Sequence, residues 1–241
     1  MSLPPDPRTT YDPSDPAEDP SLAGKHRLTR AVKRVVDLVA HVDVEAADPS
    51  TIDALTREAE AMAARLEPLP DLHARGGLAI AGGPQSALLE RSGISGRSNP
   101  LAVPVQWGAP DADGVLRGRA TYSGAYEGPP GCVHGGFVAA AFDDIMGSAQ
   151  MMSGRAGYTG TLTVRMRRPT PLHQRIDYAA GVERVDGRKI RVWGTADCDS
   201  ERLADADILF ITPRDWGQLS GAAERHAQAQ AHAQLQVPQS G

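Results

Sequence analysis

A short stretch in the middle of the chain combines residue types that can act together on a carbonyl group. The turn Gly128–Gly136 ends in His134, Gly135 and Gly136 and leads directly into an apolar run, Phe137–Met152, that is typical of a helix. The first N–H groups of a helix have no partner inside it, so they can stabilise negative charge developing on a carbonyl oxygen. Because Gly135 has no Cβ, a substrate can approach that helix end closely.

Two adjacent carboxylates, Asp143 and Asp144, interrupt this apolar run. A helix that is apolar on nearly every side belongs inside a fold, and carboxylates are rarely buried without a partner or a task. Asp143 can act as a general base on water or attack directly as a nucleophile, and the sequence does not choose between these roles. Asp144 lies about 100° further round the helix, so we interpret it as a supporting or surface residue.

The spacing of these residues favours a site shared by two copies of the chain. Eight helical residues separate Gly135 from Asp143 by about 12 Å, whereas a reacting carbon lies about 3 Å from each catalytic atom. Two antiparallel helices across a two-fold axis would bring Gly135 of one copy close to Asp143 of the other. We therefore expect a homodimer, or a dimer of dimers, with sites at the subunit interface.

Two helices are predicted within residues 23–70, ahead of this central stretch. The first follows apolar residues at helical spacing from Leu28, and the second starts at Ser50, whose hydroxyl can cap it. The stripe expected to be buried on the second helix consists of Ile52, Leu55, Ala59, Met62 and Leu66.

The composition of the remaining segments predicts that they lie outside the folded core. Residues 1–22 are rich in proline and acidic residues, which predicts a disordered arm. Residues 71–98 form a glycine-rich connecting loop, and residues 214–241 form a flexible tail.

Six segments alternate between apolar and polar residues as strands do. They are residues 101–107, 115–122, 159–168, 176–185, 189–198 and 203–212. Asp186-Gly187, between the fourth and fifth segments, is a hairpin turn signal. Two strands precede the central helix and four follow it, without alternation of strands and helices. This order predicts an α+β fold in which a curved antiparallel sheet wraps around one long helix.

Three features together resemble the hotdog-fold acyl-CoA thioesterases. They are the Gly-Pro-Pro-Gly-x-Val-His-Gly-Gly run, the aspartate Asp143, and the segment Thr159–Leu172 with its Arg-Pro-x-Pro-Leu end. The branch that the chain resembles most is the phenylacetate-pathway (PaaI) type, and within it the subgroup related to thioesterase superfamily member four. The resemblance covers roughly residues 99–213. It implies a hotdog domain that hydrolyses an acyl-CoA to the free acid and CoA.

The resemblance also assigns roles to residues. The family's glycine after the histidine, which offers its N–H to the thioester carbonyl, matches Gly135, and its helix carboxylate matches Asp143. Thr159 matches the hydroxyl residue that helps to place the water, and His134 orients the turn and assists in polarising the carbonyl. Gly136 is expected to lie beside the bound substrate.

One position departs from the family pattern. Some members carry asparagine six residues before the histidine, where this chain has Gly128, and the neighbouring Glu127 is not an equivalent donor. This departure is the sequence support for a non-catalytic acyl-CoA-binding domain, which stays open as an alternative. A hotdog enoyl-CoA hydratase or dehydratase is the other alternative, although His-Gly-Gly followed by an aspartate favours hydrolysis.

Basic residues on two predicted elements are candidates for binding the phosphates of CoA, because arginine matches phosphate geometry. One group is Arg165, Arg167 and Arg168, and the other is Arg188, Lys189 and Arg191. A solvated strand face has the same pattern, so the phosphate role is a hypothesis. CoA is part of the substrate, and we expect no separate cofactor.

Other residue patterns argue against further functions. The histidines His73, His173, His226 and His232 are too scattered to suggest a metal site. Cys132 precedes His134 by two residues, but only the nearby helix start would activate its thiol as a nucleophile.

Composition favours a cytoplasmic protein. The formal net charge of −5 gives no basic field for nucleic acid, and two cysteines do not make a disulfide framework. The N-terminus lacks the apolar core of a signal peptide, and no apolar run reaches the length of a membrane span.

Overall fold

The computed structural model describes residues 22–70, 90, 92–107 and 110–214. Residues 1–21 of the predicted arm, most of the predicted loop 71–98 and residues 215–241 of the predicted tail lie outside the described part. The described chain divides into two units. One comprises residues 22–41 together with the described part of 90–214, and the other comprises residues 42–70.

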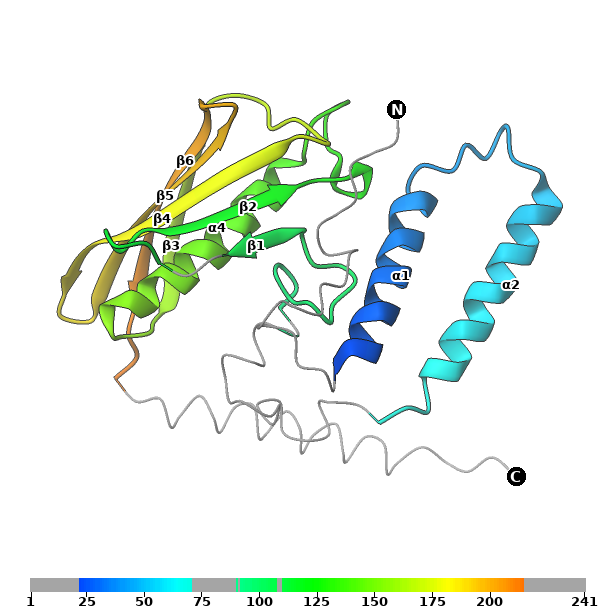
Figure 1. Cartoon of the computed structure of the whole chain (residues 1–241), viewed down its shortest axis with the longest axis horizontal. Helices are drawn as coiled ribbons and strands as arrows, with labels where there is room; N and C mark the ends of the chain where they lie inside the picture. Colours follow the sequence, from blue (N-terminus) through cyan, green and yellow to red (C-terminus); the bar gives the residue numbers. More distant parts are fainter. Residues whose placement is uncertain (1–21, 71–89, 91, 108–109, 215–241) are drawn as a thin grey trace. The chain divides into compact units, whose positions relative to one another are not determined.

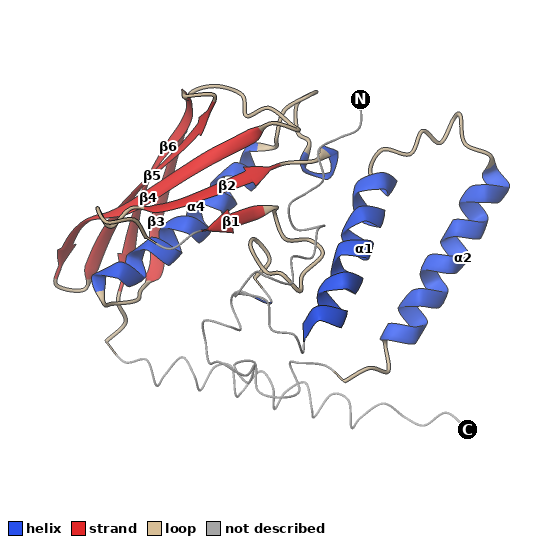
Figure 2. Cartoon of the chain, in the orientation of Figure 1, coloured by secondary structure: helices blue, strands red, loops and turns tan. Residues whose placement is uncertain are grey.

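A six-stranded antiparallel sheet forms the centre of the first unit, in the order β1-β2-β4-β5-β6-β3 (Figures 1 and 2). The strands are β1 (Val105–Trp107), β2 (Leu116–Thr121), β3 (Tyr158–Met166), β4 (Arg175–Asp186), β5 (Lys189–Cys198) and β6 (Glu201–Ile211). The predicted α+β fold is confirmed. The first strand is shorter than predicted, and one reason is that Pro104, just before it, has no N–H to donate to a neighbouring strand.

The central helix α4 (Gly135–Gln150) lies against this sheet and is extended by a 3₁₀ turn, η4 (Met151–Ser153). Its fully buried residues recur at helical spacing: Val138, Ala141, Phe142, Ile145, Met146 and Ala149. Gly194 on β5 allows the close approach, since a Cβ there would lie 2.8 Å from the Met146 sulfur. The other face of α4, including Gly135 and Asp143, is exposed. Within the described part of the chain, the helix is therefore covered on one face only, not on nearly every side as predicted.

Helix α1 (Ala23–Val39) packs against the rest of the first unit through polar residues. The residues that it buries are His26, Thr29 and Lys33. His26 bonds Glu90 at 2.8 Å, and both side chains are buried. The apolar side chains of the same helix remain largely exposed, with Val35 at 48% and Val39 at 64% of full exposure.

Helix α2 (Pro49–Leu66) belongs to the second unit and corrects two predictions. Asp48, not Ser50, caps the helix, because its side chain accepts the Thr51 N–H and Pro49 is already set for the first helical position. Ser50 donates its hydroxyl to Asp48 instead. None of the residues of α2 is buried, so the predicted stripe is not covered by the described part of the chain.

Candidate active site

The turn that precedes α4 is fixed by short backbone hydrogen bonds. Gly128 donates its N–H to the Cys132 carbonyl at 2.9 Å, and the Glu127 carboxylate accepts the Gly131 N–H at 2.7 Å. A Cβ on residue 128 would lie 2.7 Å from the His134 Cα. The turn is so tight that the position occupied by asparagine in some family members has room here only for glycine.

His134 caps α4 and sets the orientation of its first turn. Its Nδ1 accepts the Gly136 N–H at 3.0 Å, and its own N–H donates to the Tyr126 carbonyl at 2.9 Å. A backbone N–H can only donate, so Nδ1 is unprotonated and the ring hydrogen of a neutral imidazole lies on Nε2. The Gly135 N–H has no partner among the described residues and lies at the exposed end of the helix. This end offers two donors, Gly135 N–H and His134 Nε2–H, to an incoming oxygen.

Asp143 and Thr159 meet on the exposed side of α4. The Thr159 hydroxyl donates to Asp143 Oδ1 at 2.8 Å, and Thr159 is the second residue of β3. Gly135 lies at the opposite end of that strand, where its Cβ position is 3.7 Å from the Met166 methyl. The structure therefore brings together two of the predicted catalytic residues and leaves Gly135 apart from them within one chain.

Asp144 has a structural environment that differs from that of Asp143. Its Oδ2 accepts the Trp107 indole N–H at 2.7 Å, and its Oδ1 accepts the Ser92 hydroxyl at 3.3 Å. Asp144 is half-buried and ties α4 to β1. The supporting role predicted for it agrees with these contacts, although the sequence did not reveal Trp107 as the partner.

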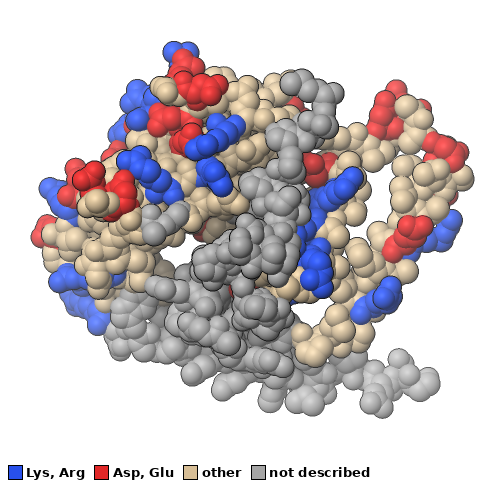
Figure 3. Space-filling model, in the orientation of Figure 1, with Lys and Arg blue, Asp and Glu red and all other residues tan. Residues whose placement is uncertain are grey.

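The predicted phosphate-binding arginines of β3 and its C-terminal extension are paired with carboxylates. Arg165 bonds Asp207 at 2.7 Å and Asp205 at 3.2 Å, Arg167 bonds Asp205, and Arg168 bonds Glu201 at 2.9 Å. The Arg167 and Arg165 hydrogen bonds hold the pKa of Asp205 below its usual value despite some desolvation. Basic and acidic side chains are interleaved over the sheet unit in Figure 3. The positive charge of this row is therefore largely compensated.

The basic residues at the β4–β5 turn bond to backbone carbonyls instead. Arg188 donates to the Thr212 carbonyl at 3.3 Å, and Arg155 donates to the Gly187 carbonyl at 2.5 Å. Lys189 is exposed beside them, and none of the three pairs with a carboxylate among the described residues. Strand register places Lys189 opposite Ile211, which in turn lies opposite Tyr158, next to Thr159. Arg155 was missed from the sequence, where only its position directly after the end of the central helix pointed to it.

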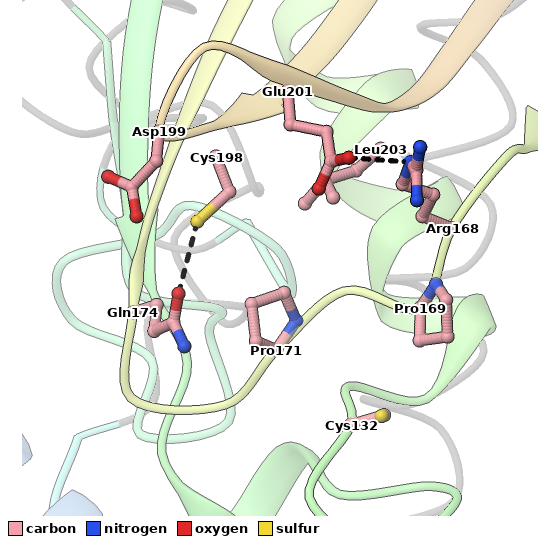
Figure 4. Close-up of a pocket in the computed structure, with 9 residues that line it drawn as sticks. All are labelled: Cys132, Arg168, Pro169, Pro171, Gln174, Cys198, Asp199, Glu201 and Leu203. Atoms are coloured by element: carbon pink, nitrogen blue, oxygen red, sulfur yellow. Dashed lines mark hydrogen bonds and ion pairs between the residues drawn. The ribbon is translucent and has the colours of Figure 1, made fainter.

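A cavity of about 600 Å³ lies beside the turn before α4, which contributes Cys132 to its lining (Figure 4). Both cysteines line it, and the Cys198 thiol donates to the Gln174 side-chain oxygen at 3.3 Å. Burial, with Asp199 and other nearby carboxylates, raises the pKa of Cys198, which keeps its thiol protonated. Neither His134 nor Asp143 lines this cavity. No hydrogen bond joins Cys132 to His134 in the described region, so a Cys–His nucleophile has no geometric support.

Two features are absent from the described residues. No helix there is long and apolar enough to cross a membrane. No group of three or more potential metal ligands gathers there either.

Comparisons with known proteins identify the family. No family model matches the chain. The curated acyl-coenzyme A thioesterase THEM4 of Xenopus laevis is 36% identical over 64 residues, which span 27% of this chain and 29% of that relative. A crystal structure of a thioesterase superfamily protein is 31% identical, covers 78% of this chain and 94% of its own, and superposes with a TM-score of 0.67. The sheet and its central helix adopt the hotdog fold that the motifs predicted. The chain therefore belongs to the thioesterase superfamily, a superfamily of thioester hydrolases.

Proposed function

We propose that this protein hydrolyses acyl-CoA thioesters, with Asp143 acting on the attacking water. The observation that carries the proposal is the Asp143–Thr159 hydrogen bond on the open face of a helix whose N-terminus offers a free N–H. The Thr159 hydroxyl donates to Oδ1 of Asp143, which fixes the carboxylate so that Oδ2 can accept a proton from water. Membership of the thioesterase superfamily supports the same reaction class.

In the proposed reaction the base lies at one end of the site and the donors that stabilise the oxyanion lie at the other. Asp143 takes a proton from water as the water oxygen attacks the carbonyl carbon. The carbonyl oxygen becomes negatively charged and accepts the Gly135 N–H, with His134 Nε2–H as a second donor. The carbon–sulfur bond then breaks, and CoA leaves as a thiolate that takes up a proton. In the alternative route Asp143 attacks the carbonyl carbon itself and forms an anhydride, which water then opens.

Single-turnover hydrolysis in ¹⁸O-labelled water distinguishes these routes. Direct attack by water places ¹⁸O only in the acid product. Attack by Asp143 leaves ¹⁸O in its carboxylate when water opens the anhydride at the enzyme carbonyl, which mass spectrometry of the peptide reveals.

The active unit in this proposal is a homodimer. One copy supplies Gly135 and the other supplies Asp143 and Thr159, because the first lies at the far end of β3 from the other two. Two exposed features support such an association. Among the described residues, β3 is an edge strand without a partner on one side, and the face of α4 that they leave uncovered carries small residues such as Ala139 and Ala140 that allow close approach.

A mixing experiment tests the shared site. Gly135→Pro removes the N–H, and Asp143→Asn removes the base, so each variant alone should be nearly inactive. Unfolded and refolded together, the two should form mixed dimers with one intact site and regain up to about one quarter of wild-type activity, from half the dimers with half the sites. No regain, with mixed dimers demonstrated by mass spectrometry, would contradict the shared site.

The phosphates of CoA are assigned to Arg188, Lys189 and Arg155 in preference to the arginine row of β3. Arg165, Arg167 and Arg168 each form an ion pair with a carboxylate, whereas Arg188, Lys189 and Arg155 form none within the described residues, although Asp186 lies opposite Lys189 in the strand register. Arginine and lysine with uncompensated charge attract phosphate more strongly. The β4–β5 turn also lies at the Thr159 end of β3.

The decisive assay is CoA release from a panel of acyl-CoAs of different chain length and polarity. Wild-type protein should release CoA from at least one of them, and Asp143→Asn should not. If no member of the panel is cleaved, the thioesterase proposal fails. Hydration of an enoyl-CoA would instead favour the hydratase alternative, and binding without turnover would favour the non-catalytic one.

A further inference from the structure

Helix α1 and the residues that follow it contact the 3₁₀ turn η3 (Gly124–Tyr126). The Asp37 carboxylate accepts the Ala125 N–H at 3.1 Å. His41, two residues after the last helical residue, packs so closely on Gly124 that a Cβ there would lie 1.5 Å from the imidazole Nε2. The end of α1 and the residues directly after it therefore lie against η3.

Lys33 contributes the third contact, one turn before Asp37. Its ammonium group donates to the Tyr126 hydroxyl and to the Ala102 carbonyl, and it lies 5.1 Å from the Tyr126 ring centroid. The Lys33 residue is only 8% exposed. A charged group is rarely buried to this extent unless its hydrogen bonds are satisfied, so the contact has a strict geometry.

The residue that Lys33 holds also positions the start of α4. The Tyr126 carbonyl accepts the His134 N–H at 2.9 Å, and the Tyr126 ring packs edge-to-face against Phe137 with centroids 5.1 Å apart. His134 in turn caps the helix through Gly136. An unbroken series of contacts therefore leads from α1 through η3 to the turn that carries the Gly135 N–H.

We propose that α1 is a positioning element for the catalytic turn, with Lys33 and Asp37 as positioning residues. Neither touches the reacting atoms. They fix η3, and η3 fixes the direction in which the Gly135 N–H and the His134 ring point. The proposal rests on the proposed thioesterase function, in which these groups bind the oxyanion. It gives the N-terminal extension, which lies outside the motif-bearing region, a part in turnover.

Kinetics of substituted α1 residues test the proposal. Lys33→Met keeps the aliphatic stem without the charge, and Asp37→Ala removes the acceptor for Ala125. Each should lower kcat roughly tenfold with KM changed less than about twofold, because a misdirected donor weakens transition-state binding selectively. Asp37→Asn keeps an acceptor oxygen and should restore kcat to within about twofold of wild type. Arg34→Met, an exposed cation of the same helix, is the matched control and should leave both constants unchanged.

Hydrogen exchange provides a readout that does not depend on turnover. In Lys33→Met and Asp37→Ala, the amides of Ala125 and His134 should exchange at least about tenfold faster, whereas those of the distant β4–β5 ladder should not. Unchanged exchange and unchanged kcat in both variants would overturn the proposal. So would a fall in kcat that matches the loss of folded protein, or an Asp37→Asn variant as impaired as Asp37→Ala. If wild type cleaves no thioester but the exchange rates rise as expected, the thioesterase function fails while the structural part of the inference stands.

Discussion

Substitutions of the two adjacent aspartates of α4 should have different effects, with Asp144 important for stability and Asp143 for catalysis. Asp144 accepts a 2.7 Å hydrogen bond from the half-buried Trp107 indole and a longer one from Ser92. A hydrogen bond to a charged group contributes about 1.5–3 kcal/mol, and its loss here leaves the indole N–H without this partner. We therefore expect Asp144→Ala to lower the free energy of unfolding by about 2 kcal/mol. In a protein of this size that corresponds to a Tm lower by about 4–8 °C.

Asp143 should behave in the opposite way. It is exposed, and asparagine at the same position keeps an oxygen that can accept the Thr159 hydroxyl. Asp143→Asn should change stability by less than about 0.5 kcal/mol. Loss of a general base lowers kcat by about 10²–10⁴-fold, which corresponds to about 2.7–5.4 kcal/mol of transition-state stabilisation. Asp144→Ala should keep kcat within about threefold of wild type when measured well below its Tm.

Thermal unfolding followed by circular dichroism and steady-state CoA release measure the two quantities on the same preparations. Trp107→Phe completes a double-mutant cycle with Asp144→Ala and should show a coupling energy of about 1–2 kcal/mol. The assignment would be refuted if Asp144→Ala abolished turnover at unchanged Tm while Asp143→Asn remained active. A coupling energy near zero would refute the role given to the Trp107–Asp144 bond.

Three further predictions concern packing, pH and substrate binding. Gly118→Ala should lower the free energy of unfolding by about 1–3 kcal/mol, because the added Cβ would lie 1.9 Å from the Trp107 ring. Gly93→Ala is the control and should be tolerated, because no atom lies within 4 Å of the added Cβ. Denaturant unfolding measures both variants. Burial raises the pKa of the Tyr178 hydroxyl above its ordinary value of 10.0, so the unfolded chain loses this proton at lower pH than the folded protein does. The contribution of Tyr178 to the free energy of unfolding is therefore fully present below pH 10 and is lost as the pH rises above 10. Tyr178→Phe should therefore flatten the fall of Tm above pH 10, and an unchanged slope would contradict this. Arg188→Gln and Lys189→Gln should each raise KM for an acyl-CoA several-fold but not for the matching acyl-pantetheine, while Arg165→Gln should change neither; an equal effect on both substrates would argue against phosphate binding.

The sequence was sufficient to predict the order of the strands and the central helix along the chain. Period-two alternation and the Asp186-Gly187 turn define β4 and β5 almost to the residue, since the two faces differ in burial along β5 and along the first half of β4. Resemblance to a known family singled out both Asp143 and Thr159, and the structure joins them by a hydrogen bond. These features are encoded locally or by motif.

What the sequence did not reveal depends on contacts between distant residues. The partner of Asp144 is Trp107, 37 positions earlier, and no local pattern links them. The first helix was predicted from apolar residues at helical spacing, yet the residues that α1 buries are polar and include Lys33, whose hydrogen-bond partner Ala102 lies 69 positions away. The cap of α2 was misplaced by two residues because Asp48 and Ser50 are both good caps and Pro49 favours the first.

The polar contacts between α1 and η3 also limit where the chain can be truncated. Family motifs alone would place the start of an independently folding piece near residue 99. Truncation there would leave the Ala102 carbonyl and the Tyr126 hydroxyl without the ammonium group that binds both. It would also bare the Ala125 N–H and the surface around Gly124 that His41 covers. A fragment meant to report on the catalytic turn therefore has to begin before Ala23, or receive the missing helix as a separate peptide.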